Sequence, residues 1–130
     1  GAGDFHSYHI YFKSFRPKPD PLNRILALTE FGGFSLAVNG HTSSDILYGY
    51  KIFKDRQSLN DGIRNLYKTD VYPAMEKGLS ASIYTQVSDV EDEVNGIFTY
   101  DRKETKLDGD LSLKIAETLH ELFKKNYADK

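Results

Sequence analysis

The sequence has 130 residues, of which 39% are hydrophobic and 28% are charged, so it is expected to fold around one core as a single domain. Its formal net charge of -2 disfavours electrostatic capture of nucleic acid or of an anionic membrane surface. Because cysteine is absent, disulfides, thiolate metal sites and thiol catalysis are excluded, while the compartment is left open. No apolar run reaches the about 18 residues of a membrane span, and no signal-like hydrophobic segment opens the sequence.

The first predicted elements are two strands joined by a proline-rich loop. A short strand is expected at 4–8, and the segment 15–23 is expected to be a loop because each of its prolines removes an N–H donor. The continuous apolar run at 24–29 fits a strand that is covered on both faces, as in a parallel sheet. The segment 35–53 is rich in Gly, Ser, Asn and Tyr and predicts a long loop.

A helix is predicted to follow this loop. It is expected to begin near Ser58, because Ser58 with Asp61 three residues later resembles a capping box. Pro73 is expected to kink the helix or restart it, since proline cannot donate the helical hydrogen bond. Gly78 is a plausible end to the helix.

The last part of the sequence predicts a strand, an acidic loop and a helix. The strand is expected at 79–87 and the acidic loop at 88–95, and the helix is expected from about Leu111 with Asp110 or Ser112 as its cap. Strands that alternate with helices predict an α/β fold with a parallel sheet. Three strands are few for a complete α/β domain, so this set of elements is typical of the end of a larger barrel.

Glu30 is the first candidate for chemistry, because it ends the second predicted strand and directly precedes two glycines. Active sites of parallel α/β folds lie at the C-terminal ends of the strands. A carboxylate in that position can point into a cleft while the backbone turns away. The alternative is a glutamate that caps or pairs within a turn.

The acidic loop is the second candidate, with the four carboxylates of Asp89, Glu91, Asp92 and Glu93 close together. These groups repel one another and need solvent, a cation, basic partners or hydroxyl donors. A solvated loop is the simplest interpretation. The spaced ligands and the glycine of an EF-hand calcium loop are absent.

The histidines are the third set of candidates. His6 and His9 lie three residues apart in a predicted strand and therefore face opposite sides, so no shared metal is expected, and one of them is more plausible as a polar site residue. His41 follows Glu30 in the long loop, where it could bond a ligand.

Several segments together resemble glycoside hydrolase family 2. The matching segments are TEFGG at 29–33 with NGHT at 39–42 for the seventh barrel strand, SIYTQVSDVEDEVNG at 82–96 with TYDRK at 99–103 for the eighth, and DFHSYH at 4–9 for the sixth. The similarity covers about residues 4 to 108, and the motif of the eighth strand is long and specific. The family includes β-galactosidase, β-glucuronidase and β-mannosidase-like enzymes.

The resemblance implies a (β/α)₈ TIM barrel whose retaining chemistry uses two glutamates and neither a metal nor a cofactor. The nucleophile follows the seventh strand, and the matching position here is Glu30. The acid/base glutamate follows the fourth strand in an Asn-Glu pair, which this sequence lacks. Residues 1–130 are therefore expected to be one partial domain, the C-terminal portion of the barrel (about strands 6 to 8), which contributes the nucleophile and is inactive alone.

The same resemblance suggests further site residues and partners. Glu30 needs hydrogen-bond donors to remain ionised, and Tyr8, His6 and His41 are the candidates. Asp89 or Glu91, at the mouth of the barrel, could accept hydrogen bonds from the hydroxyls of a β-glycoside substrate. The isolated segment is expected to form homo-oligomers, because an unclosed sheet leaves two edges and one apolar face exposed.

Two alternatives remain beside a catalytic segment. The first is a carbohydrate-binding or structural relative that kept the barrel and lost catalysis. The second is an unrelated small α/β binding module, which the length of the motif at the eighth strand disfavours.

Overall fold

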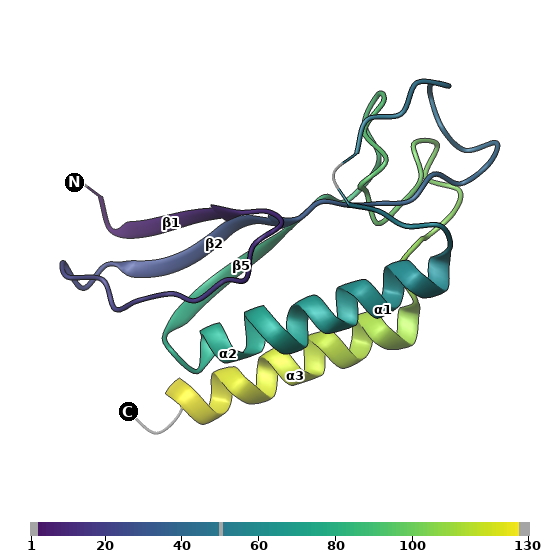
Figure 1. Ribbon diagram of the computed structural model, residues 1–130. Coiled ribbons are helices and arrows are strands. Elements are labelled where there is room, and N and C mark those ends of the chain that lie inside the picture. The colour runs from purple at the N-terminus through teal and green to yellow at the C-terminus, as the bar shows by residue number, and fades with distance from the viewer. Residues whose placement is uncertain (1–2, 50, 128–130) are drawn as a thin grey trace.

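The computed structural model describes residues 3–49 and 51–127, and it has a mixed α/β fold with few helices. The elements in chain order are β1 (Phe5–Ile10), β2 (Ile25–Gly32), β3 (Phe34–Ser35), β4 (Lys51–Ile52), α1 (Arg56–Leu66), the π-helix η1 (Tyr67–Val71), α2 (Tyr72–Met75), β5 (Leu79–Thr85) and α3 (Gly109–Tyr127). The predicted order of β1, β2, β5 and the helices is confirmed (Figure 1), whereas the short paired strands β3 and β4 lie at the two ends of the segment 35–53, which was predicted to be a loop.

The main sheet has three parallel strands in the order β1-β2-β5. β1 and β2 are joined by the predicted proline-rich loop, whereas the connection from β2 to β5 contains the first helices. The pairing of β1 with β2 shifts in register between Tyr8 and His9, so that His9 lies opposite Glu30. This shift determines which side chain of β1 meets the carboxylate.

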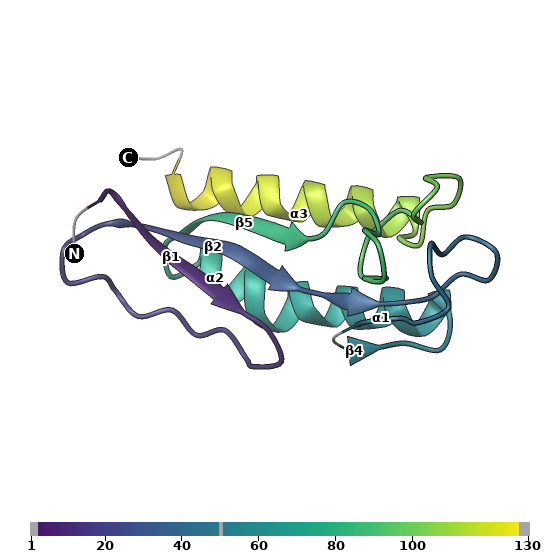
Figure 2. The same ribbon diagram turned by 90° about the horizontal axis from the view of Figure 1, so that it is seen from above.

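The helices lie together on one face of the sheet (Figures 1 and 2). Leu26, Leu28 and Phe31 of β2 pack in a buried cluster with Val71 and Ala74 from the helical segment. Leu26 and Leu28 lie two residues apart and share the face that the helices cover, and the register shift between Leu28 and Phe31 brings Phe31 onto it as well. The opposite face, which we call the open face, carries no helix from the described residues.

The alternation of side chains along β5 shows which of its residues lie on the open face. Ile83 lies between Ser82 and Tyr84 in β5, and the Tyr84 ring packs against the core. Ile83 therefore points the other way, and 58% of its surface is exposed. An exposed isoleucine at the centre of a strand indicates that this face of the sheet is apolar in part.

The start of α1 differs from the prediction. The helix begins at Arg56, and Asp55 caps it by accepting a hydrogen bond from the backbone N–H of Ser58 at 2.7 Å. Asp61 does not complete a capping box, because its carboxylate bonds the side chains of Gln57 and Arg64 instead. An aspartate three residues before Ser58 competes for the same role, and the sequence pattern did not separate the two.

The start of α3 also differs from the prediction. The helix begins at Gly109, and the carboxylate of Asp108 accepts hydrogen bonds from the backbone N–H groups of Asp110 at 2.8 Å and Leu111 at 3.4 Å. Asp108 is therefore the cap, in place of Asp110 or Ser112. Lys124 and Lys125 lie in the last turn, where positive charge suits the helix dipole.

The predicted interruption of the first helical segment is confirmed. The chain passes from α1 through the π-helix into α2, with Pro73 in the first turn of α2. A π-turn before a proline accommodates the missing hydrogen-bond donor without ending the helix. Gly78 then adopts φ +95°, a left-handed conformation that glycine takes readily, and β5 begins at the next residue.

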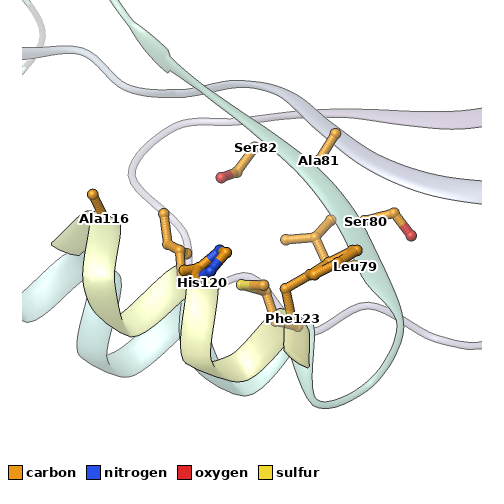
Figure 3. A pocket seen from close by; sticks show the side chains of 9 residues that line it. Leu79, Ser80, Ala81, Ser82, Ala116, His120 and Phe123 are labelled. Carbon is orange, nitrogen blue, oxygen red and sulfur yellow. The ribbon is translucent and has the colours of Figure 1, made fainter. Parts of the chain in front are cut away.

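A groove of about 410 Å³ runs between β5 and α3 (Figure 3). Leu79 and Met75 line one side, and His120 and Phe123 of α3 line the other. β5 pairs with β2 along its other edge, so this groove follows an edge of the sheet that no described strand occupies.

Candidate functional site

Glu30 lies near the C-terminal end of the middle strand, on the open face. Tyr8 and Ile10 pack against the core, so the His9 side chain between them points away from the helices. The Nδ1 atom of His9 is 3.5 Å from Oε2 of Glu30, which places the carboxylate on the same side. The Glu30 side chain is 47% exposed and is therefore accessible to a ligand.

Tyr11 is the residue that holds this carboxylate. Its hydroxyl oxygen lies 3.0 Å from Oε2 of Glu30 and 3.1 Å from Oγ1 of Thr85. A phenol has one proton and an ionised carboxylate only accepts, so Tyr11 donates to Glu30 and accepts from the Thr85 hydroxyl. The contact joins the ends of all three parallel strands at one point.

Sequence reasoning missed Tyr11, although a signal was present. Tyr11 follows His9 by two residues, and residues two apart share a face of an extended chain. Once His9 is assigned to the face of Glu30, Tyr11 follows on the same side. The sequence does not show the register shift that brings His9 opposite Glu30.

None of the three expected donors bonds Glu30. Nδ1 of His6 lies 2.6 Å from Oδ2 of Asp20, and its ring stacks on Tyr8 with 4.4 Å between centroids. Tyr8 in turn packs against the core, so both residues lie on the face that the helices cover. The expectation that they hold the Glu30 carboxylate is therefore wrong, and the predicted separation of His6 from His9 is confirmed.

His41 is engaged elsewhere. Its Nδ1 atom lies 2.9 Å from Oδ2 of Asp101, and this hydrogen bond is the main cause that lowers the pKa of the Asp101 carboxyl. The pair ties the long loop after β3 to the segment that precedes α3. His41 therefore joins two loops and does not reach Glu30.

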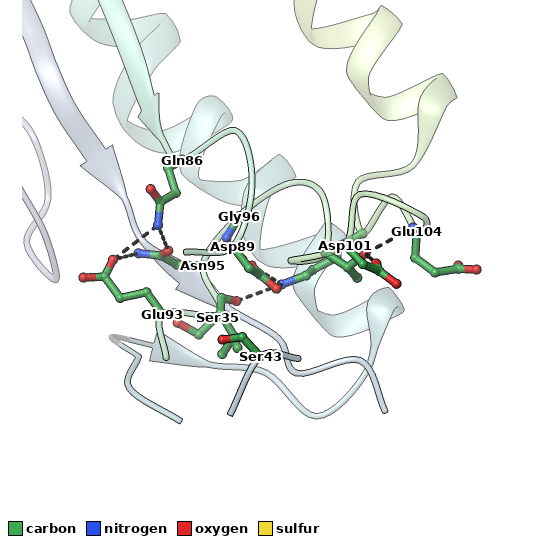
Figure 4. Close-up of polar contacts among 12 residues, drawn as sticks. Ser35, Ser43, Gln86, Asp89, Glu93, Asn95, Gly96, Asp101 and Glu104 are labelled. Atoms are coloured by element: carbon green, nitrogen blue, oxygen red, sulfur yellow. Dashed lines mark hydrogen bonds and ion pairs between the residues drawn. The ribbon is translucent and has the colours of Figure 1, made fainter. Parts of the chain in front are cut away.

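Asp89 lies in a buried ion pair. Its two carboxylate oxygens are 2.6 and 2.7 Å from Nζ of Lys106, and each of the two side chains is at most 1% exposed. Oδ1 of Asp89 also accepts from the backbone N–H of Gly96 at 2.8 Å. Burial lowers the pKa of the Lys106 ammonium, and the Asp89 carboxylate opposes that effect. The geometry gives Asp89 a role inside the loop, as Figure 4 shows.

Gly96 is required at its position in this loop. A Cβ atom there would lie 2.1 Å from the backbone nitrogen of Asp89 and 2.2 Å from the backbone carbon of Ser88. Because both are backbone atoms, no side-chain movement could relieve the contact. The close approach explains the glycine after Asn95.

The remaining acidic residues of the loop differ in surroundings. Glu91 is exposed and has φ 53°, and the described contacts include none to its carboxylate. Oε2 of Glu93 accepts from Nε2 of Gln86 at 3.3 Å and from Nδ2 of Asn95 at 3.4 Å. Among the described contacts of the loop carboxylates, Glu93 is therefore the one that side-chain amide groups bond (Figure 4).

Residues 3–49 and 51–127 contain no group of three His, Asp or Glu side chains placed to bind a metal ion. Within the same residues, no helix is both long enough and apolar enough to cross a membrane.

A scan against protein-family models finds no match, and a search of curated proteins finds none of significant similarity. The resemblance to glycoside hydrolase family 2 therefore stays a prediction that rests on the sequence motifs.

Proposed function

We propose that the chain is the C-terminal portion of the TIM barrel of a family 2 glycoside hydrolase and that it supplies the nucleophile, Glu30. Consecutive parallel strands in the order β1-β2-β5 are what strands 6 to 8 of such a barrel require. Helices on one face only are also consistent with a barrel wall, whose other face lines the interior.

The observation that carries the proposal is the placement of Glu30. Its carboxylate stands near the C-terminal end of the middle parallel strand, on the open face, and accepts a hydrogen bond from Tyr11. Carboxyl ends of barrel strands are where active sites form. A carboxylate that is accessible and held at one oxygen suits a nucleophile.

The reaction assigned to Glu30 is a double displacement at the anomeric carbon. Oε2 accepts from Tyr11, so Oε1 remains to attack, and a covalent glycosyl-enzyme forms as the leaving oxygen departs. A second carboxyl, about 5–5.5 Å away, protonates the leaving oxygen and then activates water. The sequence has no Asn-Glu pair for this second role, so the chain alone is expected to be inactive.

The proposed partner is a β-glycoside. The chemistry needs two carboxyl groups and water, and no cofactor enters it. The sheet edges and the open face would be covered by the rest of the barrel in the complete enzyme.

Kinetics of the protein that contains this segment within a complete barrel test the proposal. Glu30→Gln removes the attacking charge and is expected to lower kcat by on the order of 10⁴-fold or more on an aryl β-glycoside. The matched control is Glu117→Gln on the exposed side of α3, which is expected to leave kcat unchanged. A Glu30→Gln enzyme that retains its activity would overturn the assignment.

Two further outcomes separate the alternatives. Sugar binding without turnover by the complete protein would favour the non-catalytic carbohydrate-binding relative. Turnover by the isolated chain of 130 residues, abolished by Glu30→Gln, would show that the second carboxyl lies within it.

A further inference from the structure

Two acceptor oxygens in the loop that follows β5 have no partner in the described part of the chain. Nε2 of Gln86 lies 2.6 Å from Oδ1 of Asn95 and 3.3 Å from Oε2 of Glu93. An ionised carboxylate only accepts, so the amide nitrogen of Gln86 must face it, and this fixes the orientation of the Gln86 amide. Oε1 of Gln86 and Oε1 of Glu93 are then left as acceptors without a described donor.

The side-chain amide of Asn95 bonds both Gln86 and Glu93 and so holds them in place. Asn95 is 1% exposed, and its Nδ2 atom donates to Oε2 of Glu93 at 3.4 Å. Its neighbour Val94 is anchored in turn, because the Val94 carbonyl accepts from the backbone N–H of Leu36 at 2.9 Å and from Nζ of Lys106 at 3.0 Å. The loop that carries Glu93 is therefore fixed against both Leu36, directly after β3, and the buried ion pair.

The position of Gln86 connects these acceptors to Glu30. Gln86 directly follows Thr85, whose hydroxyl bonds the same Tyr11 that donates to Glu30. The two strands continue side by side past this point, because the N–H of Gly33 donates to the carbonyl of Thr85 at 3.0 Å. Gln86 therefore lies one residue beyond the contact between Thr85 and Tyr11, and Glu93 bonds its side-chain amide (Figure 4).

We infer that Gln86 and Glu93 form a subsite that binds the hydroxyl groups of the sugar next to Glu30. The inference deepens the proposed function and rests on it for placing a sugar at Glu30. The two free acceptor oxygens, Oε1 of Gln86 and Oε1 of Glu93, favour a ligand that carries two hydrogen-bond donors close together. Two hydroxyl groups on adjacent carbons of a sugar ring are such donors. Asp89 cannot serve here, because both of its oxygens bond Lys106.

The charge of the subsite selects among sugars. Glu93 and Glu30 are both carboxylates, so a sugar acid placed between them would bring a third negative charge into the site. Like charges at short range disfavour binding. The subsite therefore takes a neutral pyranoside in preference to a glycuronide, by about tenfold or more in affinity.

The side-chain amide signals of Gln86 and Asn95 report on the subsite directly by NMR, in the protein that contains this segment within a complete barrel and carries Glu30→Gln to prevent turnover. Titration with methyl β-D-galactopyranoside, methyl β-D-glucopyranoside and methyl β-D-mannopyranoside is expected to shift both signals saturably with at least one sugar, at a dissociation constant in the millimolar range. Methyl β-D-glucuronide is expected to bind at least about tenfold more weakly. Glu93→Gln keeps the side-chain size and is expected to weaken binding of the neutral sugar about tenfold, whereas Glu117→Gln is expected to leave it unchanged.

The outcomes separate the subsite from the proposed function. If none of the sugars shifts either signal, or if Glu93→Gln binds as tightly as the protein that retains Glu93, the subsite is refuted, whatever Glu30 does in the complete enzyme. If the glucuronide binds as well as the neutral sugars, the charge argument is wrong. If the signals respond but the complete enzyme shows no need for Glu30, the subsite stands and the catalytic assignment falls.

Discussion

Replacing Lys106 by methionine tests how the loop after β5 is held together. Lys106 and Asp89 are fully buried, with Nζ within 2.7 Å of both carboxylate oxygens. Removing one member of a buried pair leaves the other charge without compensation and costs about 3–5 kcal/mol. A domain of this size has about 5–15 kcal/mol of stability in total, so the variant loses about a fifth of it or more.

The double variant Asp89→Leu/Lys106→Met isolates the cause. It removes both charges together and is expected to recover most of the lost stability. The attraction within a buried ion pair offsets little more than the free energy needed to remove its two charges from water. Urea unfolding followed by circular dichroism measures both effects, since the chain has no tryptophan to report by fluorescence. The control is Arg56→Ala, which breaks an exposed pair with Glu104 and is expected to cost no more than about 1 kcal/mol.

The reasoning fails if Lys106→Met costs no more than the exposed control. It also fails if the double variant is as unstable as the single one, because the loss would then come from packing. A loss in Lys106→Met with recovery in the double variant is the pattern that the buried charge predicts.

Three further predictions concern packing, pH and assembly. Gly32→Ala places a Cβ 2.3 Å from the Tyr84 ring, whereas Gly78→Ala meets nothing within 4 Å at a similar φ, so thermal melts should show the former about 1–3 kcal/mol less stable. Burial raises the pKa of Tyr67 from 10.0 to about 12, so its contribution to stability is complete below pH 10 and is lost as the pH rises through about 12; urea midpoints that stay constant over this range would contradict the assignment. The isolated chain should sediment as an oligomer at micromolar concentration and Ile83→Asp should shift it toward monomer, because the open face exposes apolar side chains; a monomeric unmodified chain would refute this.

The order of the elements was predictable because strong local signals mark them. The apolar run at 24–29 and the proline-rich loop before it each have one simple interpretation, and β2 and its parallel neighbours followed. The first residues of the helices were harder to predict than the order of the elements. Asp55 precedes Ser58, and Asp108 precedes Asp110, and in each pair both side chains are able to cap.

The sequence singled out Glu30 and the acidic loop as candidates, but it did not show the contacts that these residues make. The sequence shows the charge of Asp89 but does not show that Lys106, 17 residues later, neutralises it in the interior. The contact of Tyr11 with Glu30 could not be predicted either, because it depends on the pairing of the strands and on a register shift. Contacts between segments distant in sequence decide which charged groups remain free for a ligand.

The identity of Glu30 as a nucleophile is tested most directly by trapping the covalent intermediate. An activated 2-fluoro β-glycoside is added to the protein that contains this segment within a complete barrel, and this protein is then digested and analysed by tandem mass spectrometry. The account predicts a glycosyl ester on the peptide that contains Glu30, and no label in a Glu30→Gln enzyme. A label on a different carboxylate, with Glu30 unmodified, would contradict it.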